Sequence, residues 1–172
     1  LTYQGELADA VYHSTCGGRT ESAQEVWGTS FAYLKGVPCD FCRDSPHYRT
    51  QVTLSAKQIA QCLGRNGGTV PVMASSGSLR VLETTPSGRV RTIQVGQSVI
   101  KGTEFRGKLG LPSTWFSWRV DGDRVTFEVR GWGHGVGMCQ YGARGMARQG
   151  RTYTDILSYY FPGTQVKSMF AE

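Results

Sequence analysis

A run of alternating glycines near the C-terminal end most constrains what this chain can fold into. Residues 131–137 read Gly-Trp-Gly-His-Gly-Val-Gly, so four glycines alternate with larger side chains. Each glycine inside a regular helix costs roughly 0.5–1 kcal/mol relative to alanine, so this run disfavours an ordinary helix. We expect the backbone to approach a ligand closely here and to present Trp132 and His134 at fixed spacing. The alternative is a tight glycine loop in which His134 is merely packed.

Length and composition favour one mixed domain. The chain has 172 residues, enough for one well-buried core, and we expect a single domain over residues 1–172. Its 23 glycines and its charged fraction of only 19% favour a body rich in sheet and loops over a helical bundle. The predicted fold class is α+β, with a central antiparallel sheet, a short helix near 55–64 and a helical C-terminal third.

Local patterns place the elements along the chain. Ser55 has Gln58 three positions later, the spacing of a capping box, so a helix is expected to start there. It is expected to end at Gly64 and the Asn66-Gly67-Gly68 run. Pro-Ser-Gly and Asp-Gly-Asp turns between apolar runs predict antiparallel hairpins. Strands are expected at 79–85, 89–95, 116–120, 124–129 and 166–169, with short strands around residues 4–6. A strand and a helical turn are expected within 99–111. Two further helices are expected, one over 138–148 and one capped by Thr154.

Two ordered blocks resemble the stage II sporulation protein D (SpoIID) / LytB amidase-enhancer family. The first block holds Tyr12-His13-Ser14-Thr15-Cys16-Gly17-Gly18-Arg19-Thr20, Glu25-Val26-Trp27-Gly28 and Tyr33-Leu34-Lys35-Gly36-Val37. The second holds Gly133-His134-Gly135-Val136-Gly137-Met138, Gln140-Tyr141-Gly142-Ala143 and Gly145-Met146-Ala147, followed by Tyr153, Ile156-Leu157, Tyr159-Tyr160 and Gly163-Thr164. The resemblance implies a SpoIID/LytB-like domain that lacks the family's N-terminal helical block.

The resemblance also implies a substrate groove lined by both blocks. Sugar recognition needs neutral hydrogen-bonding groups above an aromatic platform, which Trp27 or Trp132 can provide. The alternatives are that His13 is a strand-end residue bonded to backbone, and that Tyr141 and Trp132 simply pack. The expected substrate-binding residues are His13, Ser14, Thr15, Trp132, His134, Gln140 and Tyr141.

The activity implied by the resemblance is that of a peptidoglycan lytic transglycosylase, which cleaves glycan strands at the MurNAc-GlcNAc bond. Cleavage of a glycosidic bond needs a carboxylic acid, and the resemblance places the catalytic glutamate upstream of this chain. Glu21 and Glu25, the carboxylates next to the first motif, are expected to be surface or loop-fixing residues, with a catalytic role as the alternative. The alternative function is a non-catalytic cell-wall binding module that enhances an N-acetylmuramoyl-L-alanine amidase. A third interpretation is a structural domain held together by zinc.

A Cys-x-x-Cys pair predicts a metal site. Cys39 and Cys42 have the spacing of two zinc ligands, with His47 five residues later and Cys16 beside a glycine pair. We expect a structural Zn²⁺ bound by these four residues, with His13 as the alternative fourth ligand, and some members of the family carry zinc near this position. A Cys16–Cys42 or Cys39–Cys42 disulfide and free thiols remain alternatives. Cys62 and Cys139, the latter at a position where the family usually has serine, are expected to be unpaired.

Charge and hydropathy limit the partners. The net charge of +6 and the isoelectric point near 9.2 favour an anionic partner such as a cell-wall polymer. The basic residues are scattered, so no nucleic-acid-binding arm is expected. The chain contains no run of 18 apolar residues, so no transmembrane helix is expected in it. The chain opens without a signal sequence, and we expect it to be a fragment or processed form. We expect it to work outside the cytoplasm, in the periplasm or cell wall. Its expected partners are peptidoglycan glycan strands and a cell-wall amidase.

Overall fold

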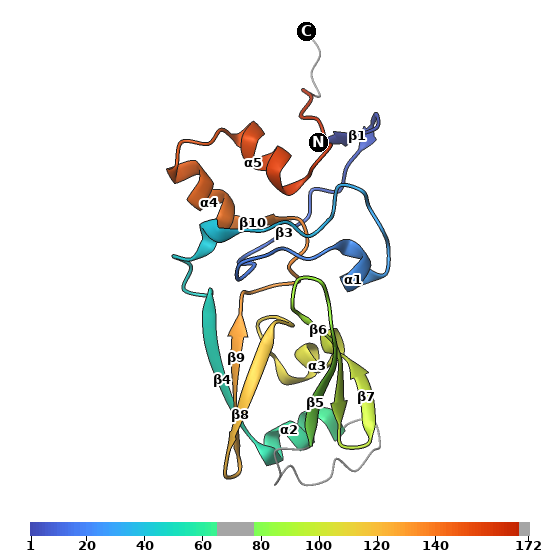
Figure 1. The fold of residues 1–172 in the computed structure, drawn as a ribbon, viewed down its shortest axis with the longest axis vertical. Helices are drawn as coiled ribbons and strands as arrows, with labels where there is room; N and C mark the ends of the chain where they lie inside the picture. The colour runs from blue at the N-terminus through green and yellow to red at the C-terminus, as the bar shows by residue number, and fades with distance from the viewer. Residues whose placement is uncertain (65–77, 169–172) are drawn as a thin grey trace. The chain divides into compact units, whose positions relative to one another are not determined.

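The computed structural model describes residues 1–64 and 78–168, and their contacts group into two compact units. One unit combines residues 1–48 with the chain from residue 131 onward, and the other holds residues 49–130. Helices and antiparallel sheets occur together, so the predicted α+β class is confirmed (Figure 1). Several small sheets replace the single central sheet that we expected. None of the helices in the described ranges is long and apolar enough to cross a membrane.

The discontinuous unit is built from short elements around a core rich in cysteine and aromatic residues. Strands β1 (Thr2–Tyr3) and β2 (Glu6–Leu7) form an antiparallel hairpin, whereas β3 (Tyr12–His13) and β10 (Met138–Cys139) pair in parallel. The helical elements are α1 (Ala23–Trp27), the 3-10 turn η1 (Asp40–Cys42), α4 (Gln140–Arg148) and α5 (Tyr153–Tyr160). Their buried core includes Leu34, Val136, Met146, Tyr160 and Phe161.

The glycine run leads into β10 as an irregular loop. All four of its glycines have positive φ, from 71° to 109°. A Cβ on Gly133 would lie 2.9 Å from the Cβ of His13, and one on Gly131 would lie 2.6 Å from the carbonyl oxygen of Thr15. Thr15 and Trp132 also exchange two backbone hydrogen bonds, of 3.1 and 2.7 Å. The loop therefore lies close to the protein's own chain at His13 and Thr15, as in the tight-loop alternative, and the close approach to a ligand stays a prediction.

The continuous unit packs two three-stranded antiparallel sheets and two helices around an apolar core within its described residues. One sheet has the order β4 (Arg49–Ser55), β9 (Arg124–Arg130), β8 (Phe116–Asp121), and the other has the order β5 (Leu79–Thr84), β6 (Val90–Val95), β7 (Ser98–Lys101). Helices α2 (Ala56–Leu63) and α3 (Gly102–Leu109) complete the unit. Ile59, Ile93, Phe105 and Phe127 from four of these elements are fully buried together.

Most predicted elements are present, with corrections at their ends. The Ser55 and Gln58 capping box starts α2 as predicted, but the last helix is capped by Thr152, not Thr154, because Asp155 completes the box three residues after Thr152. The helix within 99–111 is a full α-helix. Residues 166–168 form no strand, and the helical C-terminal third is not confirmed, because the glycine loop and β10 occupy its start. Asn66-Gly67-Gly68 and Met169 lie outside the described residues.

Candidate functional site

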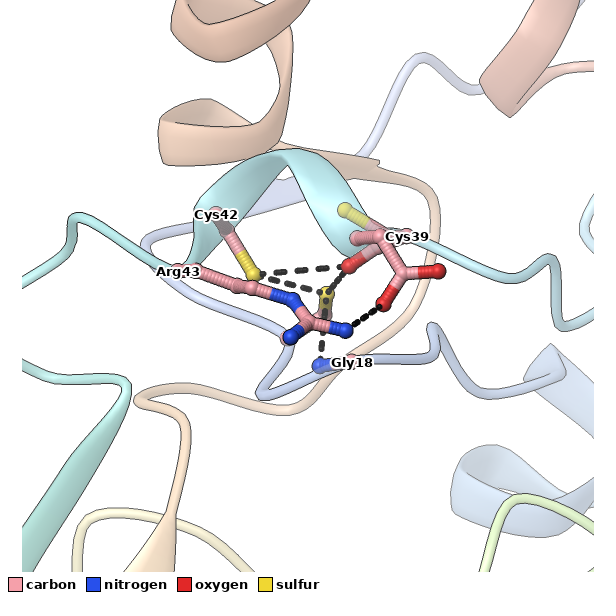
Figure 2. Close-up of polar contacts among 6 residues, drawn as sticks. Gly18, Cys39, Cys42 and Arg43 are labelled. Carbon is pink, nitrogen blue, oxygen red and sulfur yellow. Dashed lines mark hydrogen bonds and ion pairs between the residues drawn. The ribbon is translucent and has the colours of Figure 1, made fainter.

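Four buried cysteines meet in the core of the discontinuous unit. The sulfurs of Cys16, Cys39, Cys42 and Cys139 all lie within 4.8 Å of one another, and all four side chains are fully buried. Cys39 and Cys42 flank the turn η1, and Figure 2 shows them beside Gly18. Cys139 ends β10, and Cys16 lies three residues after β3, which the parallel pairing of Cys139 with His13 places beside β10. Segments far apart in the sequence thus converge on one group of thiols.

The geometry of this group fits a tetrahedral metal ion. Zinc–sulfur bonds of about 2.3 Å place the sulfurs of a tetrahedral four-cysteine site about 3.8 Å apart, and the Cys16 and Cys42 sulfurs are separated by 3.4 Å. Backbone N–H groups of Cys16 and Gly142 both donate to the Cys139 sulfur at 3.3 Å, and the N–H of Gly18 donates to the Cys16 sulfur at 3.5 Å. Such bonds stabilise thiolates, the form that binds a metal. The four cysteines can therefore hold a metal ion.

The fourth member of this group differs from the residue that we predicted. His47 lies outside the group, and its ring packs against Trp132 with centroids 4.6 Å apart. Cys139, which we expected to be unpaired, takes the fourth place. The Cys-x-x-Cys spacing and the neighbouring glycine pair identified three members, whereas the fourth depends on the pairing of β3 with β10, which no local pattern in the sequence reveals.

The four thiols hold their protons unequally. Hydrogen bonding with Cys139 lowers the pKa of Cys42 and of Cys39, and it raises the pKa of Cys16. Burial raises the pKa of Tyr160, so its hydroxyl, 3.0 Å from the Cys39 sulfur, stays protonated and can donate to it. The group therefore favours thiolate at some positions and thiol at others, and a bound cation would favour thiolate at all four.

The buried His13 and the half-buried His134 lie side by side in the discontinuous unit. Their ring centroids are 5.6 Å apart in an edge-to-face arrangement, so the two histidines do not lie on opposite faces. His13 is buried at the end of β3, and its Nδ1 lies 3.0 Å from the carbonyl oxygen of Val136. This contact with the backbone matches the alternative that we gave for His13, in which a strand-end histidine is bonded to the main chain.

Backbone groups fix the tautomer of His134. Its Nδ1 accepts a hydrogen bond from the N–H of Val136 at 3.1 Å, so the ring proton is on Nε2, which donates to the carbonyl oxygen of Tyr12 at 3.0 Å. The ring also contacts the indole of Trp27, with centroids 5.2 Å apart, and this indole is 48% exposed. Both ring nitrogens of His134 thus bond to the main chain, and the ring lies beside an exposed aromatic face.

The remaining predicted substrate residues divide into accessible and internal groups. Gln140 and Trp132 are exposed, while Ser14 and Tyr141 are half-buried. Thr15 is buried, and its hydroxyl lies 2.7 Å from that of Ser45. Gln140, Trp132 and parts of Ser14 and Tyr141 are therefore each accessible to a ligand, whereas Thr15 supports the loop from inside.

The two carboxylates next to the first motif differ in their surroundings. Glu21 is buried, and its carboxylate accepts a hydrogen bond of 2.9 Å from the N–H of Ser22 at the start of α1. Its own backbone N–H donates to the carbonyl oxygen of Gly135 in the glycine loop at 2.8 Å. Glu25 lies half-buried on α1. Glu21 therefore fixes the loop, as one of our two interpretations expected.

Comparisons with known proteins group this chain with relatives named for sporulation and for amidase enhancement. A family model for a domain of unknown function (DUF8618) matches residues 33–137. Stage II sporulation protein D of Bacillus subtilis (strain 168) is 40% identical over 166 residues, which cover 96% of this chain and 47% of that protein. An uncharacterized protein of Brachyspira hyodysenteriae is 32% identical over 168 residues, 95% of this chain and 44% of that protein. The amidase enhancer of the same B. subtilis strain is 26% identical over 220 residues, 98% of this chain and 31% of that relative. The chain thus spans about half the length of the first of these relatives, and less of the others.

Proposed function

Because this chain belongs to the DUF8618 family and is a homologue of stage II sporulation protein D, we propose that it forms the substrate groove of a peptidoglycan lytic transglycosylase. The bond cleaved is the MurNAc-GlcNAc bond of the glycan strand, and the site of action is outside the cytoplasm. The observation that carries the proposal is the surface at which His134 contacts the exposed indole of Trp27 next to His13.

The chemistry of this surface suits a neutral sugar. An exposed indole can stack on the apolar face of a pyranose ring, while the amide of Gln140 and the hydroxyl groups of Ser14 and Tyr141 can bond sugar hydroxyls. Because backbone groups bond to both nitrogens of His134, we assign this ring to positioning and stacking. The part of the site described here therefore binds and orients the strand.

The catalytic acid of this proposal comes from another segment of the full-length protein. A glycosidic bond breaks when a carboxylic acid protonates the leaving oxygen. Glu21 is buried, and its carboxylate accepts a hydrogen bond from the start of α1 while its backbone N–H holds the glycine loop, so we assign it a structural role. A transglycosylase needs a single such acid if the 6-hydroxyl of the muramyl sugar attacks the anomeric carbon and forms an anhydro product.

A structural zinc completes the proposed site from beneath. Cys16, Cys39, Cys42 and Cys139 would hold it as four thiolates, which leaves no open position for a substrate or water. The ion would supply a cross-link between η1, the end of β10 and the segment that follows β3. Since β3 carries His13 and the glycine loop leads into β10, this cross-link would fix the spacing of the two histidines.

The proposal is tested by mass spectrometry of the products released from purified glycan strands. The full-length protein is expected to release fragments with anhydro-muramyl ends, whereas residues 1–172 alone are expected to bind strands without cleaving them. Trp27→Ala should weaken strand binding, while Tyr153→Ala, which removes an exposed aromatic ring from α5, serves as the matched control. Absence of anhydro ends from the full-length protein, or equal binding by the two variants, would contradict the proposal.

The alternative is a non-catalytic wall-binding module that enhances a cell-wall amidase. The similarity to a protein named amidase enhancer, which extends over 98% of this chain, favours it. This function predicts that the full-length protein binds strands and raises the rate at which an N-acetylmuramoyl-L-alanine amidase releases stem peptides, with no anhydro-muramyl product. The same digestion, run with and without the amidase, separates the two functions.

A further inference from the structure

The outer face of the β4-β9-β8 sheet carries a pocket that the proposed groove does not use. The pocket has a volume of ≈ 690 Å³, within the range of sites that bind small molecules. Its lining comes from the ends of the three strands and from Gly88, all within the continuous unit. The lining combines the apolar residues Phe116 and Val129 with residues that carry polar groups, among them Arg49, Gln51, Trp115, Ser117, Glu128 and Arg130.

Two arginines face each other across this sheet. Arg49 on β4 pairs directly with Arg130 on β9 in the antiparallel register. Like charges directly opposite on neighbouring strands destabilise a sheet. No carboxylate among the described residues forms an ion pair with either guanidinium, and the Nε of Arg130 is buried without a hydrogen-bond partner in that part of the chain. The pocket therefore holds positive charge that the protein itself does not neutralise.

The indole of Trp115 holds the second arginine in place. The guanidinium of Arg130 lies over this ring at 4.6 Å from its centroid, and that of the buried Arg89 lies at 5.3 Å. The backbone N–H of Arg130 also donates to the carbonyl oxygen of Trp115 at 2.8 Å. Arg130 is thus pre-oriented, so a ligand that binds it loses little side-chain entropy.

The one carboxylate that lines the pocket, that of Glu128, contacts Arg119 and Gln51 and forms no ion pair with Arg49 or Arg130. An oxygen of Glu128 lies 3.8 Å from a guanidinium nitrogen of Arg119 and 3.5 Å from the amide nitrogen of Gln51. Gln51 and Ser117 are exposed on the same face and can bond hydroxyl groups. Two guanidinium groups next to neutral hydrogen-bonding side chains match a ligand that joins an oxyanion to a hydroxyl-rich body.

We propose that this pocket binds the carboxylate or phosphate group of an anionic saccharide, with Arg49 and Arg130 as the oxyanion ligands. Guanidinium groups bind both oxyanions through paired, charge-assisted hydrogen bonds. A pocket of ≈ 690 Å³ has room for one or two sugar rings beside the anion. The inference concerns residues 49–130 alone and stands whether or not the chain acts on glycan strands.

Isothermal titration calorimetry with the whole chain tests this proposal. The probes are glucuronic acid, glucose 1-phosphate and neutral glucose, which separate a carboxylate source from a phosphate source and from sugar alone. Both anionic probes, or one of them, should bind in low salt, glucose should bind at least about tenfold more weakly, and added salt should weaken the anionic probes only.

Three substitutions at the pocket and one outside it are expected to change the affinity for the anionic probes in different directions. Arg49→Gln should weaken the anionic probes by about tenfold or more, and Glu128→Gln should strengthen them because it removes a like charge. Arg130→Lys keeps the charge but loses the paired geometry, so it should also weaken binding. Arg124→Gln, at the other end of β9, is the charge-matched control and should bind as the unaltered chain does.

Two results would overturn the assignment. One is equal binding of glucose and the anionic probes, or no binding of any probe at millimolar concentration. The other is equal loss of affinity in Arg49→Gln and Arg124→Gln, since this would mean that net charge and not the pocket attracts the anion. Because Arg49 is exposed and its charge opposes that of Arg130, its replacement should not lower the unfolding temperature, and the same measurement on each variant identifies any that fails to fold.

Discussion

Replacing Cys139 by serine tests whether four thiolates bind the proposed zinc. The sulfur of Cys139 accepts two backbone N–H groups at 3.3 Å, and a serine hydroxyl can accept the same bonds. The metal-free chain should therefore change its free energy of unfolding by no more than about 1 kcal/mol. The effect on the metal should be much larger, because a ligand is removed.

The expected loss of zinc affinity follows from the removal of a metal ligand, and the burial of the four sulfurs determines which thiols react. Loss of a residue that only supports a metal ligand lowers metal affinity about 10–100-fold. Loss of a ligand itself should therefore lower zinc affinity more than about 100-fold, which is a loss of binding free energy above about 2.7 kcal/mol. In the unaltered chain only Cys62 is accessible enough to react with a thiol reagent, while the four clustered cysteines are fully buried. Zinc-loaded protein should thus expose one reactive thiol, and a chelator in denaturant should expose all five.

The assay combines zinc content by elemental analysis with thiol titration. Cys139→Ser should lose zinc to a competing chelator that leaves the unaltered chain loaded, whereas His47→Ala should retain it, since His47 packs against Trp132. The reverse pattern would refute the four-thiolate arrangement. A metal-free chain whose mass is lower by two hydrogens would instead show a disulfide, for which Cys16 and Cys42, with sulfurs 3.4 Å apart, are a candidate pair.

Further predictions concern the free energy of unfolding measured in urea. Gly133→Ala should destabilise the chain by about 1–3 kcal/mol, because φ is +109° and the new Cβ would lie 2.9 Å from that of His13; no loss would mean that the loop is not held against β3. Gly107→Ala on α3 has no atom within 4 Å of the new Cβ and should stabilise by up to about 1 kcal/mol. Thr152→Ala removes the N-cap of α5 and should cost about 1 kcal/mol, so a larger loss would point to a role beyond the cap. Phe127→Ala in the buried core of the continuous unit should cost about 3–5 kcal/mol, and a loss below about 1 kcal/mol would contradict that packing.

Local chemistry made part of the fold predictable. The Ser55 and Gln58 capping box and the Asp-Gly-Asp turn at 121–123 act over a few residues, and both elements were found where the sequence placed them. Strand β4 was missed because its alternation of Thr50, Val52 and Leu54 with polar residues is short, and its partner β9 lies far along the chain. The misplaced cap at Thr154 has another cause, since two threonines precede Asp155 and only the first has the spacing of a capping box.

The candidate site divides in the same way. Cys39 and Cys42 are recognisable as a pair because a single turn brings them together, and Cys16 stands next to Gly17-Gly18 in a motif. Cys139 joins them only through the parallel pairing of β3 with β10, a contact across most of the chain. The hydrogen bonds of His134 also depend on the folded loop, so the sequence indicated the residue but not its tautomer.

The discontinuity of the first unit sets an order on its assembly during synthesis. The residues of the continuous unit, 49–130, leave the ribosome as one block and can pack as soon as they are all present. Cys16, Cys39 and Cys42 emerge earlier but lack their fourth partner until Cys139 is made. At about 5–20 residues per second, translation takes on the order of 5–20 s to cover that interval. During this time three thiols remain open to oxidation or to a foreign metal, and the last helices close the unit around them.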